Sequence, residues 1–402
     1  MNATLQVSLQ PAPKRVIADG ARAPLLDSRG AAIALGFNAT EQGMVAPVVP
    51  SERTMFAPRA ACVATNGSLW VADTGHHRLL GWTALPTEDN EPATVLVGQR
   101  SFGDEGRNGR GDPGPATLNV PTGIAACSNG LALADAWNHR VLLWLEPPRR
   151  HNQRPDLVLG QGSFGAADPN GGRETPAADT LFWPFGVAWD GTRLWVADTG
   201  NRRVLVWDGL PTRSGQRADL VLGQRGFACR DENSGGAPSA ASMRWPHGIA
   251  FLGPRVFIAD AGNNRVMGWP QTPSSDGQAC ETLLGQPGAD TADHNQGDYF
   301  PGSATLNMPY ALTTVADWLV VADTANSRLV AWREADIANG AAASRLAGQD
   351  DWRAKGENRW RSPSRDSLCW PYGLGISGRH AIIADAGNNR VLLWPWSEEI
   401  VA

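Results

Sequence analysis

Lysine is almost absent from this chain of 402 residues, because Lys14 and Lys355 are its only lysines and arginine supplies the remaining positive charge. Charged residues make up 19% of the sequence, and the net charge of −5 excludes a general attraction to nucleic acids or anionic membranes. Residues 1–30 lack the continuous apolar stretch of a secretory signal, and no apolar run is long enough to span a membrane. We therefore expect a soluble, cytoplasmic protein that does not bind membranes.

Cysteine pairs and helical periodicity are also missing. The five cysteines are odd in number and include no Cys-x-x-Cys pair, so neither a disulfide framework nor a zinc–thiolate site is expected. No segment keeps a helical period over several turns, which excludes a helical bundle. Glycine and proline are abundant instead, with 45 and 29 copies, and they predict many tight turns.

One short phrase, Ala-Asp-(Thr/Ala), recurs six times at intervals of 62 or 63 residues. An arginine follows each aspartate by five residues, a tryptophan follows by nine, and a proline precedes it by 14 or 15. The aspartates are Asp73, Asp135, Asp198, Asp260, Asp323 and Asp385, and the arginines are Arg78, Arg140, Arg203, Arg265, Arg328 and Arg390. A fixed period of this kind is the signature of a repeat architecture.

Each repeat contains four short β-rich runs separated by Gly, Asn, Asp and Pro. In the third repeat these runs are residues 183–189, 194–198, 203–207 and 220–224. Four-stranded units repeated around an axis are the blades of a β-propeller, which leaves few free sheet edges. We predict an all-β fold, a six-bladed β-propeller of four-stranded antiparallel blades.

The repeated phrases resemble those of a known family. Residues 196–201, 258–265 and 383–390, the last two with the sequence Ile-Ala-Asp-Ala-Gly-Asn-Asn-Arg, are similar to NHL repeats. The preceding Pro-x-Gly-(Ile/Val)-Ala runs are similar to the first strand of that repeat. The resemblance extends over residues 55–402 and implies a six-bladed β-propeller of the NHL-repeat family, here with a long loop after each Gly-Gln step.

The sixth repeat ends soon after Trp394, before a fourth strand. Residues 31–36, Ala-Ala-Ile-Ala-Leu-Gly, are similar to the fourth runs of the other repeats, so we predict that they form the outer strand of the last blade and close the ring. The alternative is that Glu398–Ala402 supply this strand. The chain then divides into an N-terminal extension at 1–30, where residues 16–19 are similar to a repeat fragment, and one propeller at 31–402.

We interpret the aspartate and arginine of every repeat as structural. They flank the turn between the second and third strands, where a carboxylate can accept backbone N–H bonds and an arginine can bind a carboxylate or carbonyl. The alternative is a set of six acidic groups around a pore. A scaffold repeats its residues whereas catalysis breaks the symmetry, which favours the structural interpretation.

The position after each repeated proline varies, although it recurs at the same place in every repeat. We expect these six side chains at the mouth of the central channel, close to three tryptophans that precede the proline. The expected binding residues are Arg59, Thr122, Phe185, His247, Tyr310 and Tyr372, with Trp183, Trp245 and Trp370. The alternative is an aromatic plug that fills a narrow channel.

Two enzyme families with related propellers provide a test. Propellers similar to the peptide-amidating lyases hold zinc through histidines at these positions, and lactonase-type propellers hold calcium through carboxylates and asparagines. Catalytic zinc takes three protein ligands, and here only His247 is available; no acidic residue occupies the six places. We therefore expect no catalytic residue, no metal and no cofactor, with a metal-dependent lyase or lactonase as an alternative.

Two sets of asymmetric surface-loop residues complete the candidates. Two of the turns carry His76, His77 and Trp137, and the last long loop carries Trp352, Arg353, Arg359, Trp360 and Arg361. Tryptophan interleaved with arginine can stack single-stranded RNA, and some NHL propellers bind RNA, so RNA binding by residues 352–365 is an alternative. Acidic neighbours offset this charge, and we do not expect nucleic acid as the main partner.

The absence of a nucleophile–base pair, a metal-ligand set and a phosphate loop favours binding over catalysis. We predict a non-enzymatic propeller that binds another protein through the long-loop face and the channel mouth. The expected role is that of an accessory, scaffold or assembly partner in a bacterial protein complex.

Overall fold

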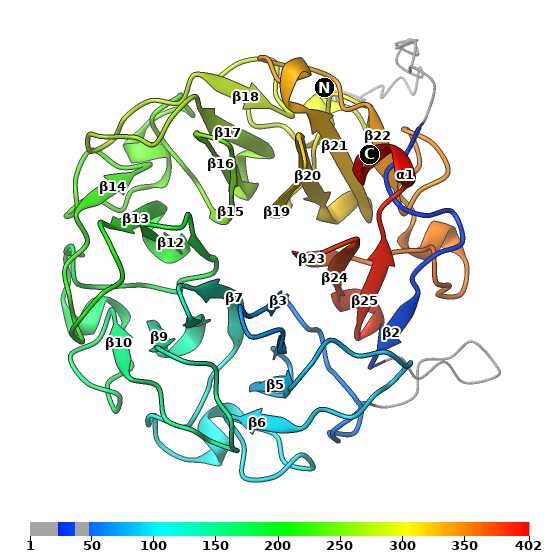
Figure 1. The fold of residues 1–402 in the computed structure, drawn as a ribbon. Helices are drawn as coiled ribbons and strands as arrows, with labels where there is room; N and C mark the ends of the chain where they lie inside the picture. The colour runs from blue at the N-terminus through cyan, green and yellow to red at the C-terminus, as the bar shows by residue number, and fades with distance from the viewer. Residues whose placement is uncertain (1–22, 37–47, 402) are drawn as a thin grey trace, which may run out of the picture.

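The computed structural model describes residues 23–36 and 48–401, which form a closed ring of six blades around a central channel (Figure 1). The strands of the first three blades are β3 (Ala60–Val63), β4 (Leu69–Asp73), β5 (Arg78–Trp82) and β6 (Val95–Val97); β7 (Pro121–Cys127), β8 (Gly130–Asp135), β9 (Arg140–Trp144) and β10 (Leu157–Leu159); and β11 (Val187–Trp189), β12 (Leu194–Asp198), β13 (Arg203–Trp207) and β14 (Leu220–Leu222).

The strands of the other three blades are β15 (Pro246–Leu252), β16 (Arg255–Asp260), β17 (Arg265–Trp269) and β18 (Thr282–Leu284); β19 (Pro309–Val315), β20 (Trp318–Asp323), β21 (Arg328–Arg333) and β22 (Arg345–Ala347); and β23 (Pro371–Ser377), β24 (His380–Asp385), β25 (Arg390–Pro395) and β2 (Ile33–Leu35). Neighbouring strands within each blade are antiparallel. The predicted six-bladed fold is therefore confirmed.

The hydrophobic core lies between the blades. The buried apolar residues form six clusters, and each cluster takes its members from two neighbouring blades. Alternate residues of a strand point to opposite faces of its sheet, so both faces of every blade are covered by a neighbour. The middle strands accordingly consist of nearly continuous apolar residues. In β12, for example, the four residues Leu-Trp-Val-Ala are all buried.

The ring is closed by a strand from the other end of the chain. β2 pairs with β25 in antiparallel register, with Leu35 opposite Val391, which confirms the prediction for residues 31–36. The alternative strand at Glu398–Ala402 is wrong, because Glu398–Val401 form the short helix α1 and bury Ile400 in the core. A chain end that forms a helix cannot pair with the edge of a sheet.

Residues 23–30, which the sequence analysis left without a place, lie against the fifth and sixth blades. β1 (Ala23–Pro24) adds a parallel fifth strand beside β22, and Leu25 and Leu26 are buried. The repeat-like residues 16–19 lie outside the described residues.

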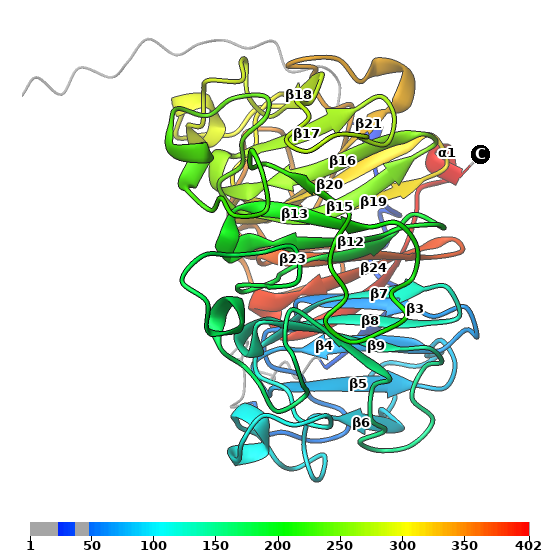
Figure 2. The ribbon, with the colours of Figure 1, turned by 90° about the vertical axis from the view of Figure 1, so that its left-hand side faces the viewer.

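The ring has two distinct faces. The long-loop face carries the strand 4-to-1 loops, with the 3-10 turns η1 (Arg107–Arg110), η3 (Pro169–Gly172), η5 (Glu232–Gly235), η7 (His294–Gly297) and η10 (Glu357–Trp360), and also the strand 2-to-3 turns. The hairpin face carries the strand 1-to-2 and 3-to-4 connections and α1. Figure 2 shows the long loops on the left and α1 on the right.

Candidate binding site: the channel mouth and the long-loop face

The repeated aspartates lie in buried networks at the end of the second strand of each blade. In the second blade, Asp135 Oδ1 accepts the Asn119 N–H at 2.7 Å, and Oδ2 accepts Asn138 Nδ2 at 2.7 Å and Arg140 Nε at 2.8 Å. Burial raises the pKa of Asp135, and the charge of Arg140 opposes the shift. The same Asp–Arg contact, at 2.7–2.9 Å, occurs in all six blades.

The arginine of each network also holds the long loops. Arg140 donates to the carbonyls of Gly114 and Thr117 in the loop before its blade and to that of Phe164 in the loop after it. The carboxylate and guanidinium are fully buried, away from the channel. This geometry suits the structural part proposed for these residues rather than a ring of acids around a pore.

Histidines replace the usual turn residues in the first two blades. His76 is fully buried and its Nδ1 lies 2.8 Å from Asp73 Oδ2, where the other blades have asparagine. The prediction that His76 lies on the surface is therefore wrong, because the Asp–Arg network draws this position inward. His77 Nδ1 accepts the Val120 N–H at 3.0 Å, and burial lowers its pKa.

The six residues after the repeated prolines do meet at the channel, where they line one end of a cavity of about 330 Å³. The Phe185 and His247 rings lie 4.1 Å apart, His247 and Tyr310 lie 4.3 Å apart, and Tyr310 stacks on Tyr372 at 4.7 Å, all between centroids. Thr122 is buried and donates to the Phe185 carbonyl at 2.9 Å. The mouth is thus a continuous arc of rings with one small polar residue.

Contacts across the channel show how narrow this level is. The ring centroids of Phe185 in the third blade and Tyr310 in the fifth blade lie 5.8 Å apart. The Arg59 guanidinium of the first blade lies 4.8 Å from the Tyr372 ring centroid and 5.7 Å from that of Phe185. The aromatic side chains therefore constrict the channel, as the plug alternative expected, while a cavity remains beside them.

The histidine of the mouth is neutral. His247 is 4% exposed, and its Nδ1 lies 2.8 Å from the Trp245 carbonyl oxygen, which can only accept a hydrogen bond. Nδ1 therefore carries the proton and Nε2 does not. Burial lowers the pKa of His247 to about 3, and the positive charge of Arg59 adds to the shift.

The tryptophans before the prolines form part of the rim. Trp183 and Trp370 are exposed by 37% and 46%, whereas Trp245 is half-buried with Arg244 over its ring. Trp137, on the turn of the second blade, is 44% exposed and lies beneath Arg107. Together they place large aromatic surfaces on the long-loop face.

The last long loop differs from its prediction. Trp352 is 4% exposed and its carbonyl binds Arg328, so its expected exposure is wrong. The Arg359 guanidinium donates a hydrogen bond to the Asp366 carboxylate, and its Nε lies 3.5 Å from Asp350 Oδ1. Arg353, Trp360 and Arg361 are exposed.

Two residues that the sequence analysis missed lie next to this loop. Tyr299 and Phe300 come from the preceding long loop and are exposed by 66% and 45%. Lys355 Nζ lies 3.5 Å from the Tyr299 ring centroid, and the Arg353 guanidinium lies 5.2 Å from that of Phe300. The adjacent Tyr-Phe pair in a polar loop was the available signal. We call Tyr299, Phe300, Arg353, Lys355 and Trp360 the aromatic–cation patch.

The described part of the chain contains no group of three or more His, Cys, Asp or Glu side chains placed to hold a metal ion. Within the same residues, no helix has the length and apolar character needed to cross a membrane.

The closed ring and its sequence repeats define the class of this protein, a six-bladed β-propeller built from repeats. Residues 57–82 match the NHL repeat, so the first blade of this propeller contains the repeat that the resemblance of the Asp–Arg turns implied.

Two relatives carry the same repeat in their names. The chain is 24% identical over 235 residues to NHL repeat-containing protein 2 of Gallus gallus and 25% identical over 236 residues to the protein of that name in Homo sapiens. Each match covers 54% of this chain and 30% of the relative, so it spans less than a third of the relatives' length.

Solved structures of low similarity include a streptogramin B lyase, with a TM-score of 0.43 and 9% identity over 87% of this chain and 97% of the lyase chain. A chain from a mitotic checkpoint complex has a TM-score of 0.49 and 11% identity, over 98% of this chain and 99% of that one. At these scores neither similarity bears on function.

Proposed function

We propose that this NHL-repeat propeller is a non-enzymatic protein-binding module, an accessory, scaffold or assembly partner that contacts another protein through its long-loop face. The observation that supports the proposal is the aromatic–cation patch, in which one long loop exposes Tyr299 and Phe300 beside two cations of the next long loop, and that next loop also exposes Trp360. Its cytoplasmic and bacterial setting stays a prediction.

The composition of the patch is that of an interface centre. Tryptophan, tyrosine and arginine are enriched among the residues that dominate binding energy. Trp360 is 79% exposed, and burying such a side chain against a partner removes a large apolar area from water. Because Lys355 and Arg353 lie over aromatic rings, their charged groups are already oriented. The partner surface that fits this patch is apolar with acidic residues around it.

A photo-crosslinker introduced at Trp360 tests the proposal. A p-benzoylphenylalanine at position 360 is expected to capture a partner protein in cells, and substituting Tyr299→Ala in the same chain is expected to reduce the yield at least several-fold. The matched control places the crosslinker at Leu145, which is 47% exposed at the start of a hairpin-face loop. Equal capture of the same protein from both positions, or capture of none, contradicts the proposal.

RNA binding, the alternative function, can be tested with the same purified protein. Arg359 is occupied by acidic neighbours and Trp352 is buried, which reduces the stacking surface of residues 352–365. Co-purifying nucleic acid, seen as a high ratio of absorbance at 260 and 280 nm, would favour RNA. Stoichiometric zinc or calcium in the purified protein would favour the metal-dependent enzyme.

A further inference from the structure

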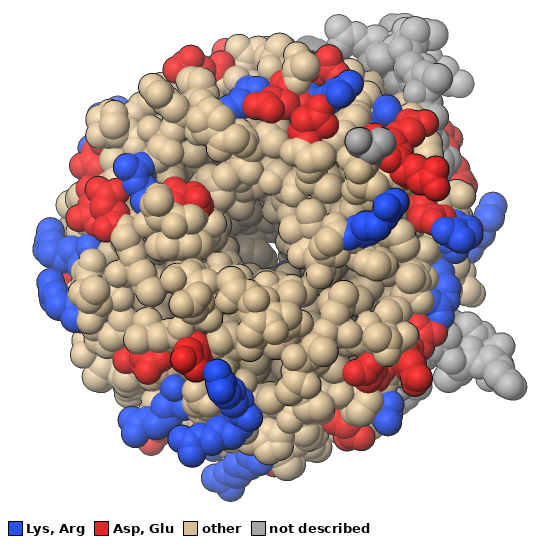
Figure 3. Space-filling model, in the orientation of Figure 1, with Lys and Arg blue, Asp and Glu red and all other residues tan. Residues whose placement is uncertain are grey.

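The central cavity is separate from the aromatic–cation patch. Its volume is about 330 Å³, and the first strands of all six blades line it, from the mouth residues to Trp189, Phe251 and Ile376 at the hairpin face. This volume lies at the lower end of the range for small-molecule sites, ~300–1,000 Å³. Figure 3, which shows the hairpin face, shows a hollow at the centre of the ring.

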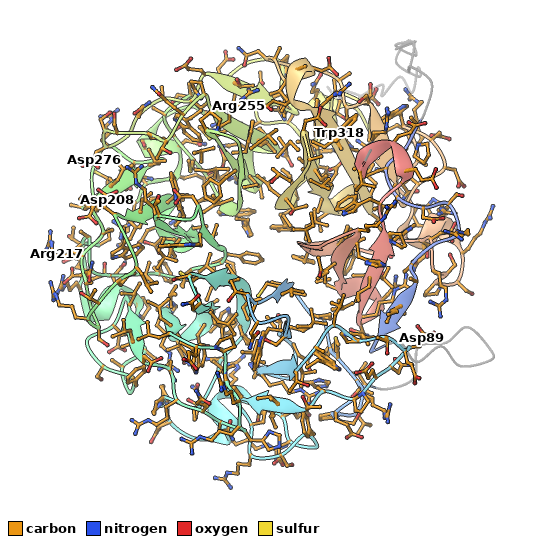
Figure 4. The ribbon with its side chains drawn as sticks, viewed as in Figure 1. Asp89, Asp208, Arg217, Arg255, Asp276 and Trp318 are labelled. Atoms are coloured by element: carbon orange, nitrogen blue, oxygen red, sulfur yellow. The ribbon has the colours of Figure 1, made fainter. Side chains whose placement is uncertain are left out.

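The walls and the entrance of the cavity are uncharged. Apolar residues of the first strands, such as Ile124, Ile249 and Leu312, form the walls. Charged side chains of the hairpin face, such as Asp208 and Asp276, lie at the outer edge of the ring (Figure 4), and uncharged residues surround the opening in Figure 3. An apolar molecule can therefore enter without displacing a charged group.

The inner end of the cavity carries a single charge. Among the described residues that line it, only Arg59 is charged, because His247 is neutral. No hydrogen bond or ion pair joins the Arg59 side chain to another described residue, and its guanidinium lies over the Tyr372 and Phe185 rings. A half-buried guanidinium in apolar surroundings favours an anion, and its fork of N–H donors matches a carboxylate.

We propose that the channel binds a small carboxylate on an aromatic or apolar body. The carboxylate pairs with Arg59, and the body lies against Trp189, Phe251 and Ile376. Two sources carry this chemistry, a free aromatic acid and the C-terminal phenylalanine of a polypeptide. The cavity opens on the face opposite the aromatic–cation patch, so this site does not depend on the proposed protein-binding function.

Isothermal titration calorimetry with three probes tests the site. The protein is titrated with 3-phenylpropionate, with its neutral analogue 3-phenylpropanamide, and with acetyl-Gly-Phe. We expect the free acid or the peptide to bind at least tenfold more tightly than the amide. Preference for the free acid identifies a small molecule as the source, and preference for the peptide identifies a polypeptide C terminus.

Three variants locate the binding. Arg59→Gln is expected to remove the preference for the carboxylate, and Ile376→Trp, which narrows the entrance, is expected to weaken all binding at least tenfold. Arg100→Gln, at an exposed position outside the cavity lining, removes the same charge and is expected to bind as the native protein does. Circular dichroism and melting temperature confirm that each variant is folded.

Three results would overturn the inference: no binding of any probe at millimolar concentration, equal affinity for acid and amide, or unchanged binding in Arg59→Gln. The Arg59→Gln variant should still crosslink through position 360, so failure of the channel site and failure of the protein-binding surface are distinguishable.

Discussion

At the scale of residues, the repeated aspartate and arginine connect parts of the chain that are far apart. The Arg140 guanidinium joins Asp135 to two different long loops. Removal of one member of a buried ion pair leaves the other charge without compensation and is strongly destabilising, so each member of the pair depends on the other. The repeat therefore stabilises the loops on which the binding surface is built.

The first prediction concerns this pair. Arg140→Met leaves Asp135 buried without its cation and should lower the free energy of unfolding by about 3–5 kcal/mol, measured by urea denaturation. Arg100→Met, at an exposed position, should change it by less than about 0.5 kcal/mol. A loss below about 1 kcal/mol for Arg140→Met would show that the pair contributes little.

A second residue-scale prediction concerns pH. His139 Nδ1 accepts the Trp183 N–H at 3.0 Å, which requires the neutral ring, and burial lowers the pKa of His139 to about 4 from 6.5. The unfolded chain binds the proton first as the pH falls, so this contribution is complete above pH 6.5 and is lost between pH 6.5 and 4. After screening at this partly exposed site, we expect a loss on the order of 1–2 kcal/mol.

His139→Asn is the matched control for the pH experiment. Asn264 and Asn389 occupy the same position in other blades, and their side-chain oxygens accept the equivalent N–H groups at 2.8 and 2.9 Å. The variant should keep the hydrogen bond without titrating. The difference in stability between native protein and variant should thus change between pH 6.5 and 4; identical pH profiles would show that His139 does not titrate as stated.

At the scale of elements, the N-terminal segment completes the sixth blade at two places. β2 supplies its fourth strand, and residues 23–27 take the place of its missing strand 3-to-4 loop. The Trp394 indole N–H donates to the Asp27 carbonyl at 2.8 Å, just as Trp144 donates to Gln153 at 2.9 Å in the second blade. The hydrogen bonds of the repeat are preserved although the chain that makes them comes from elsewhere.

Deletion of residues 1–37 tests this closure. It removes β1 and β2 together with the buried side chains of Leu25, Leu26 and Leu35, and it uncovers the edge of β25. Several kcal/mol of apolar burial are lost, about 1.5–3 kcal/mol per side chain. The melting temperature should fall sharply in differential scanning calorimetry. Deletion of residues 1–22 keeps both strands and serves as the control. An unchanged melt after the longer deletion would refute the closure.

At the scale of the whole molecule, the six blades form a symmetric frame whose two faces differ. The long-loop face carries the aromatic–cation patch, and the cavity opens on the hairpin face, which also carries α1. A partner bound to one face would leave the other accessible. The two proposed sites therefore do not depend on each other, and the crosslinking and calorimetric experiments can succeed or fail separately.

Much of the frame was predictable because it depends on local, periodic information. The 62- or 63-residue spacing, the β-rich runs and the pattern of residues 31–36 are properties of the sequence itself, and they determined the number of blades, the strands and the closing segment. The mouth residues could also be named, because equivalent positions of a repeat must meet around one axis.

Only the tertiary structure decided which side chains are exposed and what they face. Trp352 and His76 look like surface-loop residues in the sequence but are buried. Trp352 lies where its carbonyl accepts a hydrogen bond from Arg328 of β21, and His76 is drawn into the network of Asp73. Tyr299 and Lys355 lie 56 residues apart and meet only because two loops are adjacent on the ring. Arg59 is likewise the only charged side chain among the described residues that line the channel, because the other five blades place uncharged residues there. No local sequence pattern shows this.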